Sequence, residues 1–422
     1  MKIVITFFQM KPNASDKLLP EITAVNINKM VPEEPPDEEI IECNKQEICY
    51  GAGDAVFSSF VVAPLVVSVW RGIWGIMDSY PHLFPHAQIF VLGIIIHTCF
   101  ALVRSFLLSR SRDAWGEGRA GRWLRERFLS KVYTYVFILS NIMHWRGGFG
   151  LLDMFVTHII PEDDNCHRPV LIGALTLLFY LVTICFRSSR NILASPYFLV
   201  SDGKEATYIF TTRFQSKSSR ETALYILDCV FSVTVVGSLV VFVWRGSWAL
   251  LDIFLYPDDQ VKSFWTSLVV GYAIVVVTFA TQVPMRWAVG KLQGAPRLLV
   301  ADLYHLVSFL ATVNVWRAVW GLMDVYFFPD TPKLSNWCSH IISLSLLILL
   351  NCSNSILVRG VYIDAEEPAG DCVVFPCHYL RLFFHKERTK KRQKGSLTAA
   401  PTSATKKIEE ASVPLQTPEE KV

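Results

Sequence analysis

Four copies of one motif constrain the fold of this chain more than any other feature. Each copy reads Trp, Arg, small, any, aromatic, small, aliphatic, aliphatic, Asp. The defining residues are Trp70, Arg71, Trp74 and Asp78; Trp145, Arg146, Phe149 and Asp153; Trp244, Arg245, Trp248 and Asp252; and Trp316, Arg317, Trp320 and Asp324. Agreement at so many positions indicates an internal repeat.

Each copy lies at the end of an apolar run that is long enough to cross a bilayer. We predict eight spans at about 55–78, 88–108, 132–155, 169–186, 223–254, 263–283, 301–327 and 338–358. Each span is near the roughly 20 residues that a roughly 30 Å hydrocarbon layer requires. The chain is 52% hydrophobic and 18% charged, and its charges gather in tails and loops. The predicted fold class is therefore all-α: a polytopic membrane protein with eight transmembrane helices in four parallel helix-pair repeats and disordered tails.

The positions of the copies indicate that a four-span half has been duplicated. The third copy starts 174 residues after the first, and the fourth starts 171 residues after the second. We predict five regions: a disordered acidic cytoplasmic tail (1–53), a first half (54–186), a cytoplasmic linker loop (187–222), a second half (223–360) and a basic, then disordered, cytoplasmic tail (361–422).

The distribution of basic residues predicts the orientation in the membrane. The loops 109–131, 187–220 and 284–301 hold 16 Lys and Arg residues. The loops after the first, third, fifth and seventh spans hold only Arg168, Lys262 and Lys333. Since basic loops remain in the cytoplasm, both termini are predicted to be cytoplasmic.

Helix geometry predicts how the charged motif residues are arranged. Arg71, Trp74 and Asp78 fall on one stripe, with the arginine in the outer hydrocarbon and the aspartate roughly 10 Å higher, at the interface. Trp74 is predicted to lie over Arg71 in a cation–π contact. Because Arg and Asp on one helix are too far apart to pair, each arginine is expected to approach an aspartate on a neighbouring motif helix, brought close by the small residues.

Two interpretations of the motif remain open. In the structural one, the motif residues form an inter-helix network that clamps the bundle. In the functional one, the four arginines line a vestibule that binds or conducts a small anionic solute. The equal numbers of Arg and Asp favour pairing.

The remaining candidate sites are outside the motif. Cys372 and Cys377 precede a basic cluster that would attract anionic lipids of the inner leaflet, and they are candidate palmitoylation sites. Cys166 and Cys338 are a candidate disulfide. Polar residues within the spans (His97, His144, Asp228, His305 and Asn351) are expected to form helix–helix hydrogen bonds.

The sequence contains no motif typical of catalysis. We find no nucleophile elbow, phosphate loop, HExxH or paired catalytic carboxylates, and no pattern typical of metal, cofactor or nucleic-acid binding. The expectation is a protein that is not an enzyme. Residues 195–210 are expected to form a small hairpin around an Asp-Gly turn.

Four Trp-Arg-x-x-Trp/Phe-x-x-x-Asp copies on alternate spans resemble the Fuseless family of invertebrate membrane proteins. The resemblance covers about residues 54–365, and copy two departs from it with Phe149 in place of Trp. It implies a multi-pass plasma-membrane protein of presynaptic terminals, including the neuromuscular junction. It also implies a role in organising voltage-gated calcium channels, in support of synaptic transmission, with these channels or active-zone scaffolds as partners. The resemblance supplies no catalytic residues and leaves the oligomeric state open.

Overall fold

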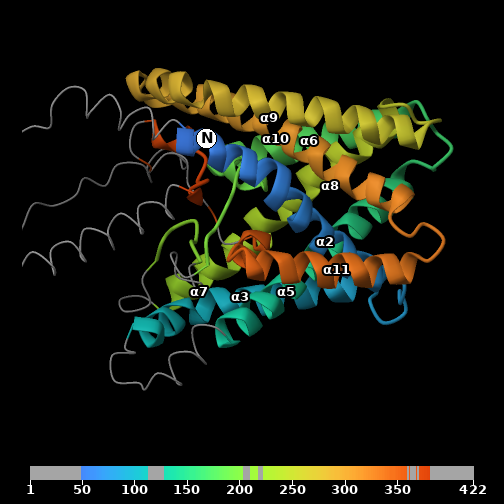
Figure 1. The fold of residues 1–422 in the computed structure, drawn as a ribbon, viewed down its shortest axis with the longest axis horizontal. Helices are drawn as coiled ribbons and strands as arrows, with labels where there is room; N and C mark the ends of the chain where they lie inside the picture. The colour runs from blue at the N-terminus through green and yellow to red at the C-terminus, as the bar shows by residue number, and fades with distance from the viewer. Residues whose placement is uncertain are drawn as a thin grey trace, which may run out of the picture. The chain divides into compact units, whose positions relative to one another are not determined.

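Long helices occupy the apolar runs of the sequence (Figure 1). The structure, a computed structural model, describes residues 49–112, 128–202, 210–216, 222–358, 361, 367 and 370–380. Three predicted regions lie wholly or partly outside the described residues. They are the first 48 residues of the predicted tail (1–53), the C-terminal stretch 381–422 and most of the basic loop after the second span.

The described α-helices include α2 (Ala63–Asp78), α3 (His86–Arg112), α5 (Ser130–Ile159), α6 (His167–Cys185), α7 (Thr222–Phe231), α8 (Ser238–Phe254), α9 (Gln260–Lys291), α10 (Gly294–Tyr326) and α11 (Pro332–Leu349). Two π-helical segments, Ser58–Val62 and Ser232–Gly237, lead into α2 and α8. Short 3-10 helices lie at Ser189–Ile192, Ser353–Ile356 and Asp371–Val373.

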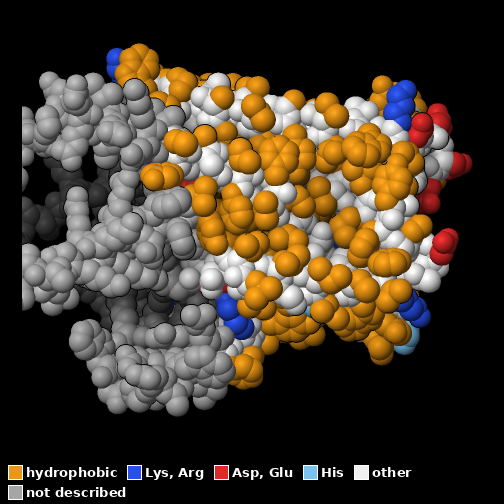
Figure 2. Space-filling view, in the orientation of Figure 1, with side chains coloured by type: hydrophobic (Ala, Val, Ile, Leu, Met, Phe, Trp, Pro, Cys, Tyr) orange, Lys and Arg blue, Asp and Glu red, His pale blue; other side chains and the backbone are white. Residues whose placement is uncertain are grey.

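Six helical stretches of the described chain are long and apolar enough to cross a membrane. They are Cys49–Asp78, His86–Leu107, His167–Cys185, Thr222–Phe254, Gln260–Lys291 and Gly294–Tyr326. On the face seen in Figure 2, hydrophobic side chains cover the described surface up to an end that carries acidic residues. The chain is therefore a helical membrane protein.

The other two predicted spans are helical but more polar, and the count of eight stays a prediction. Helix α5 covers the third predicted span, and α11 covers the first part of the eighth. The buried residues of α5 include Asn141, His144 and Arg146, and those of α11 include Asn336 and His340. These buried polar side chains lower the mean hydropathy of α5 and α11, although both helices pack against other helices of the bundle.

The four helices that carry the motif are neighbours in a closed cycle. Helix α2 contacts α5, α5 contacts α8, α8 contacts α10, and α10 contacts α2. Each of the other long helices packs mainly on one of them: α3 on α5, α6 on α8, α9 on α10 and α11 on α2. A helix that follows one motif helix in the sequence thus packs against the next motif helix, and α11 returns to the first.

The small motif residues admit these packing helices. A Cβ added to Gly72 would lie 2.6 Å from the Asn336 carbonyl oxygen of α11, and one added to Gly147 would lie 2.7 Å from the His86 carbonyl oxygen of α3. Gly321 faces Phe264 of α9 in the same way. The prediction that the small residues bring the motif helices together is therefore wrong, because the motif glycines approach α3, α6, α9 and α11.

Two local predictions are also corrected. The eighth span was predicted to reach residue 358, but α11 ends at Leu349, where Asn351 takes a left-handed φ of 54° and Cys352 N donates to Leu347 O at 2.8 Å. The turn and most of the second strand of the predicted hairpin over 195–210 lie outside the described residues, which lack 203–209, and its first strand pairs elsewhere. Leu199 forms a parallel bridge with Cys377 of the C-terminal segment instead.

Candidate functional site

Each motif arginine is bonded to the aspartate of the preceding motif copy. In every pair the arginine Nε donates to the aspartate Oδ1: Arg146 to Asp78, Arg245 to Asp153 and Arg317 to Asp252 at 2.7 Å, and Arg71 to Asp324 at 2.8 Å. The last pair joins the first copy to the fourth and closes the cycle. We call these eight residues the arginine–aspartate ring, and the end of the bundle that holds the four aspartates the aspartate end.

The ring buries its cations and leaves its anions half exposed. The side chains of Arg71, Arg146 and Arg317 are 3–4% exposed, whereas their aspartate partners are 46–53% exposed. An arginine within a transmembrane helix costs about 2.5–3.5 kcal/mol at the helix centre, so a buried one needs partners for its charge. Each aspartate supplies the charge from the surface, and the aspartate itself remains hydrated.

Three of the four arginines donate to further hydrogen-bond acceptors besides their aspartates. Arg71 donates from Nη2 to Ser335 Oγ at 2.9 Å and from Nη1 to Ser339 Oγ at 3.4 Å. Arg317 donates to Ser263 and Ser267 of α9, at 2.8 and 2.9 Å. Arg146 donates to the Phe84 carbonyl oxygen at 2.7 Å. These bonds hold the guanidinium groups inside the protein, so the motif helix and its packing helix are joined by polar contacts as well as by close packing.

Four motif tryptophans form a second ring. Trp70, Trp145, Trp244 and Trp316 meet edge to face, with centroid distances of 5.3, 5.5, 5.3 and 5.6 Å around the cycle. Three of them donate from Nε1 to a backbone carbonyl: Trp70 to Ile356, Trp244 to Ile192 and Trp316 to Ser195, at 2.8–3.0 Å. This tryptophan ring fills the middle of the motif-helix cycle and ties it to the loops.

The second aromatic of each motif forms a further layer, one turn nearer the aspartate end. Trp74 lies 5.1 Å from Phe149 and 5.6 Å from Trp320, and Trp320 lies 5.9 Å from Trp248. The predicted cation–π contact of Trp74 with Arg71 is wrong. Trp74 packs against the corresponding aromatics of neighbouring helices.

One cavity lies on each side of the tryptophan ring. The cavity toward the aspartate end has a volume of about 180 Å³ and is lined by both aromatic layers and by Arg245. The other has a volume of about 120 Å³ and is lined by the tryptophan ring together with loop residues between 190 and 211 and between 355 and 358. The predicted arginine-lined vestibule is thus an aromatic one, to which a single arginine contributes.

Carboxylates organise the opposite end of the bundle, and sequence reasoning missed most of them. Asp202 accepts bonds from Lys131, Ser353 and Asn354. Asp54 accepts from the backbone N–H groups of Tyr379 and Leu380. Glu367 and Arg190 form an ion pair at 2.6 Å. The position of Asp54 and Asp202 next to apolar segments was a signal for these two, whereas Glu367 follows Asp364 and Glu366 in an acidic stretch and had no such signal. They fasten the described loops and the C-terminal segment to the helices.

Three of the five intramembrane polar residues form side-chain hydrogen bonds, but only the bond of His144 joins two long helices as predicted, because His305 and Asp228 bond to the segments between helices. His144 lies 3.1 Å from Ser238 Oγ, and His305 lies 2.9 Å from Ser189 Oγ and 3.0 Å from Cys372 O. Asp228 accepts from Thr212 and from backbone N–H groups of residues 214 and 216. His97 differs, because neither ring nitrogen has a hydrogen-bond partner in the described part of the chain.

The structure argues against both cysteine predictions. Cys372 and Cys377 are 1% and 6% exposed, and burial raises the pKa of the Cys377 thiol to about 12. Neither thiol is presented for palmitoylation. Cys166 and Cys338 are both free thiols. The predicted disulfide is absent because Cys166 precedes α6, which packs on α8, whereas Cys338 lies on α11, which packs on α2, and these two motif helices are not neighbours in the cycle.

A helical bundle with six apolar spans and a ring of buried, paired arginines defines a polytopic membrane protein. The family model described as Fuseless matches residues 50–357, a range that includes all four motif copies. The chain belongs to the Fuseless family. No curated protein and no solved structure matches it.

Proposed function

We propose that this protein is a non-enzymatic multi-pass protein of the presynaptic plasma membrane. In this proposal it organises or regulates voltage-gated calcium channels and so supports neurotransmitter release. Membership of the Fuseless family supports the proposal. Both termini are cytoplasmic in this account, and the loops and tails of that side hold the partner surfaces.

The observation that carries this proposal is the closed arginine–aspartate ring. Its charged groups are used in pairs within the protein, and three of its arginines are almost completely buried. The buried arginines, which are unfavourable within a membrane span unless they are paired, therefore stabilise one arrangement of the helices. A bundle held in this way suits a scaffold that presents fixed loop surfaces to other membrane proteins.

The decisive experiment measures calcium-channel density at presynaptic terminals of neurons depleted of this protein. Depletion is expected to lower channel density and evoked release, and the full chain is expected to restore both. Asp324→Asn, which breaks the ring, is expected to restore less at equal surface expression. Lys262→Gln, an exposed change outside the ring, serves as the matched control and should restore fully. Unchanged channel density after depletion would contradict the proposal.

A second candidate function is transport or conduction of a small anionic solute. The observation that favours it is the pair of axial cavities, which share the tryptophan ring as a wall, with Arg245 on one of them. Purified protein in liposomes would then pass small anions. Arg245→Gln should abolish that flux without loss of protein, and Trp244→Ala, which thins the shared wall, should increase it. If the wild-type protein and Trp244→Ala both pass no anion, this candidate fails.

A further inference from the structure

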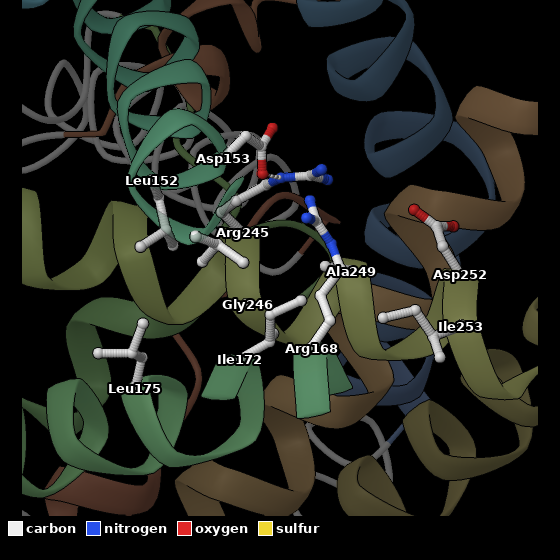
Figure 3. A pocket seen from close by; sticks show the side chains of 11 residues that line it. Leu152, Asp153, Arg168, Ile172, Leu175, Arg245, Gly246, Ala249, Asp252 and Ile253 are labelled. Atoms are coloured by element: carbon white, nitrogen blue, oxygen red, sulfur yellow. Dashed lines mark hydrogen bonds and ion pairs between the residues drawn. The ribbon is translucent and has the colours of Figure 1, made fainter. Parts of the chain in front are cut away.

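A pocket at one corner of the bundle breaks the regularity of the arginine–aspartate ring. It lies between α5, α6 and α8 and has a volume of about 160 Å³. We call it the corner pocket. Figure 3 shows the Arg168 and Arg245 side chains reaching into it from α6 and α8, with both guanidinium groups pointing toward the same part of the pocket. Leu152, Ile172, Leu175 and Ala249 contribute to its apolar wall.

Arg245 has fewer bonds than the other three ring arginines. Its Nε donates to Asp153, but in the described part of the chain its two terminal nitrogens have no hydrogen-bond acceptor. Its side chain is 25% exposed, against 3–4% for the others. The cause lies in the packing helix. Helices α9 and α11 supply serine pairs to Arg317 and Arg71, whereas α6 contains no serine and presents Leu175 to the pocket.

Arg168 brings a second cation to the same space. It donates to the Ile160 carbonyl oxygen at 3.3 Å and to Thr157 Oγ1 at 3.2 Å, and among the described residues it forms no ion pair. The two other basic residues of the predicted outer loops behave differently: Lys262 lies over the Tyr256 ring and Lys333 over the Tyr80 ring. Arg168 is therefore the one of these three whose side chain lines a cavity.

The charges around the corner pocket do not cancel. Two arginines and two aspartates line it. Asp153 is bonded to Arg245, and Asp252 is bonded to Arg317 from outside the pocket. Each ring arginine has its aspartate, whereas Arg168 has no direct ion pair among the described residues and is linked to the Glu162 carboxylate only through Thr157 Oγ1. Two neighbouring guanidinium groups in a partly apolar pocket repel each other unless an anion lies between them.

We propose that the corner pocket binds a phosphate-type oxyanion between Arg168 and Arg245. Guanidinium groups are planar donors that match the oxygens of phosphate in pairs, and both groups have donors directed to the same space. At the start of α6, Asp164 Oδ1 already accepts from the backbone N–H groups of Cys166 and His167, so the two guanidinium groups and not the helix terminus would hold the anion. The corner pocket shares Arg245 with the axial cavity toward the aspartate end, but Arg168 lines only the corner pocket of the two. The proposed site does not depend on the proposed role in channel organisation.

The oxyanion has two sources with the same chemistry, a free phosphate and the headgroup of a phospholipid. The corner pocket lies near the aspartate end, at the depth predicted for the membrane interface, where lipid phosphates gather. Exposed apolar side chains such as Met154, Phe155 and Val170 lie close to it in the sequence. Because the same two arginines would bind either oxyanion, an experiment is needed to distinguish free phosphate from a phospholipid headgroup.

The test uses the purified full chain in detergent and follows its unfolding temperature by intrinsic fluorescence. The probes are sodium phosphate and dihexanoyl phosphatidic acid, each measured against sodium chloride at the same ionic strength. A saturable rise in unfolding temperature is expected with at least one of them. A response to phosphatidic acid alone identifies a lipid headgroup, and a response to phosphate identifies a site for the free ion as well.

Arg168→Gln should raise the half-saturating concentration by about tenfold or more, because a charged hydrogen-bonding group is lost. Lys262→Gln removes the same charge at the same end of the bundle and should respond as the wild type does. If Arg168→Gln does not fold, Arg168→Lys replaces it. Its half-saturating concentration should be several-fold higher than that of the wild type, because lysine lacks the planar guanidinium group that can donate two parallel hydrogen bonds. The proposal is overturned if neither probe gives a saturable response with the wild type, or if the Arg168 variant responds as the wild type does.

Discussion

Arg71 Nε donates to Asp324 Oδ1 at 2.8 Å, although 253 residues separate the two in the chain. This bond joins the first motif copy to the last. It gives the four copies a cyclic order in which no copy is terminal. Because α11 also packs on α2, the polypeptide closes on itself at both the charged ring and the packing helices.

Breaking ring pairs should have unequal effects on stability. Asp324→Asn leaves Arg71, which is 4% exposed, without its counterion, and should lower the free energy of unfolding by about 2–4 kcal/mol. Asp153→Asn should cost roughly 1 kcal/mol, because Arg245 is 25% exposed and can be hydrated. Chemical unfolding in detergent measures both. Equal losses in the two variants would contradict the burial argument.

The close approach of α11 to α2 depends on Gly72. Gly72→Ala places a methyl group 2.6 Å from a backbone oxygen and 2.8 Å from a backbone nitrogen of α11, so the helices must separate. The expected cost is about 1–3 kcal/mol, measured in the same unfolding experiment. Gly173→Ala, with no atom within 4 Å of the added Cβ, is the matched control and should not destabilise the protein.

Trp316 should be more sensitive to replacement by phenylalanine than Trp145. Trp316→Phe leaves the Ser195 carbonyl oxygen without its donor, and the expected loss is about 1–3 kcal/mol. Trp145 Nε1 donates to no acceptor among the described residues, so Trp145→Phe should lose only the packing of the larger ring. Similar losses in both variants would show that the hydrogen bond contributes little.

Cys377 should resist alkylation to high pH. Its pKa is raised to about 12, so the thiolate that reacts is scarce at pH 7 and still scarce at pH 10, and burial blocks the reagent as well. An exposed thiol such as Cys185 should react readily. Mass spectrometry after timed alkylation of the native protein separates the two. Rapid labelling of Cys377 at pH 7 would contradict the buried C-terminal segment.

Glu367→Gln should expose that cysteine. The Glu367 carboxylate is bonded to Arg190 at 2.6 Å and helps to hold the C-terminal segment against the bundle. Loss of its charge weakens this attachment, so the rate of Cys377 alkylation should rise several-fold, in proportion to the open population. Glu162→Gln, at an exposed acidic residue far along the chain, serves as the control and should leave the rate unchanged.

The motif predicted the chemistry of the ring but not its order. The spacing of Arg71 and Asp78 excluded a pair within one helix and indicated a pair between helices. It gave no information on which neighbour supplies the aspartate, because that depends on the order of helices around the cycle. The glycines signalled a close approach, but their partners lie on α3, α6, α9 and α11, and the residues at these contacts differ, from Asn336 to Thr176 and Phe264.

Predictions at the other end of the bundle failed for a different reason. The burial of Cys372 and Cys377 depends on long-range bonds such as Leu199 to residue 376 and Tyr379 to Asp54. Composition identified a basic, cysteine-containing tail but could not show that its first part packs against the helices. The corner pocket could not be predicted from the sequence either, because it forms where α6 lacks the serines that α9 and α11 supply to their arginines.

A double-mutant cycle between Arg71 and Asp324 tests the closed ring most directly. Unfolding free energies are measured for Arg71→Gln, Asp324→Asn and the double variant, and the same cycle is repeated with Arg71 and Asp153, which are not partners. The ring predicts a coupling energy of about 1.5 kcal/mol or more for the first pair and near zero for the second. A coupling near zero between Arg71 and Asp324, or an equal coupling with Asp153, would contradict the account.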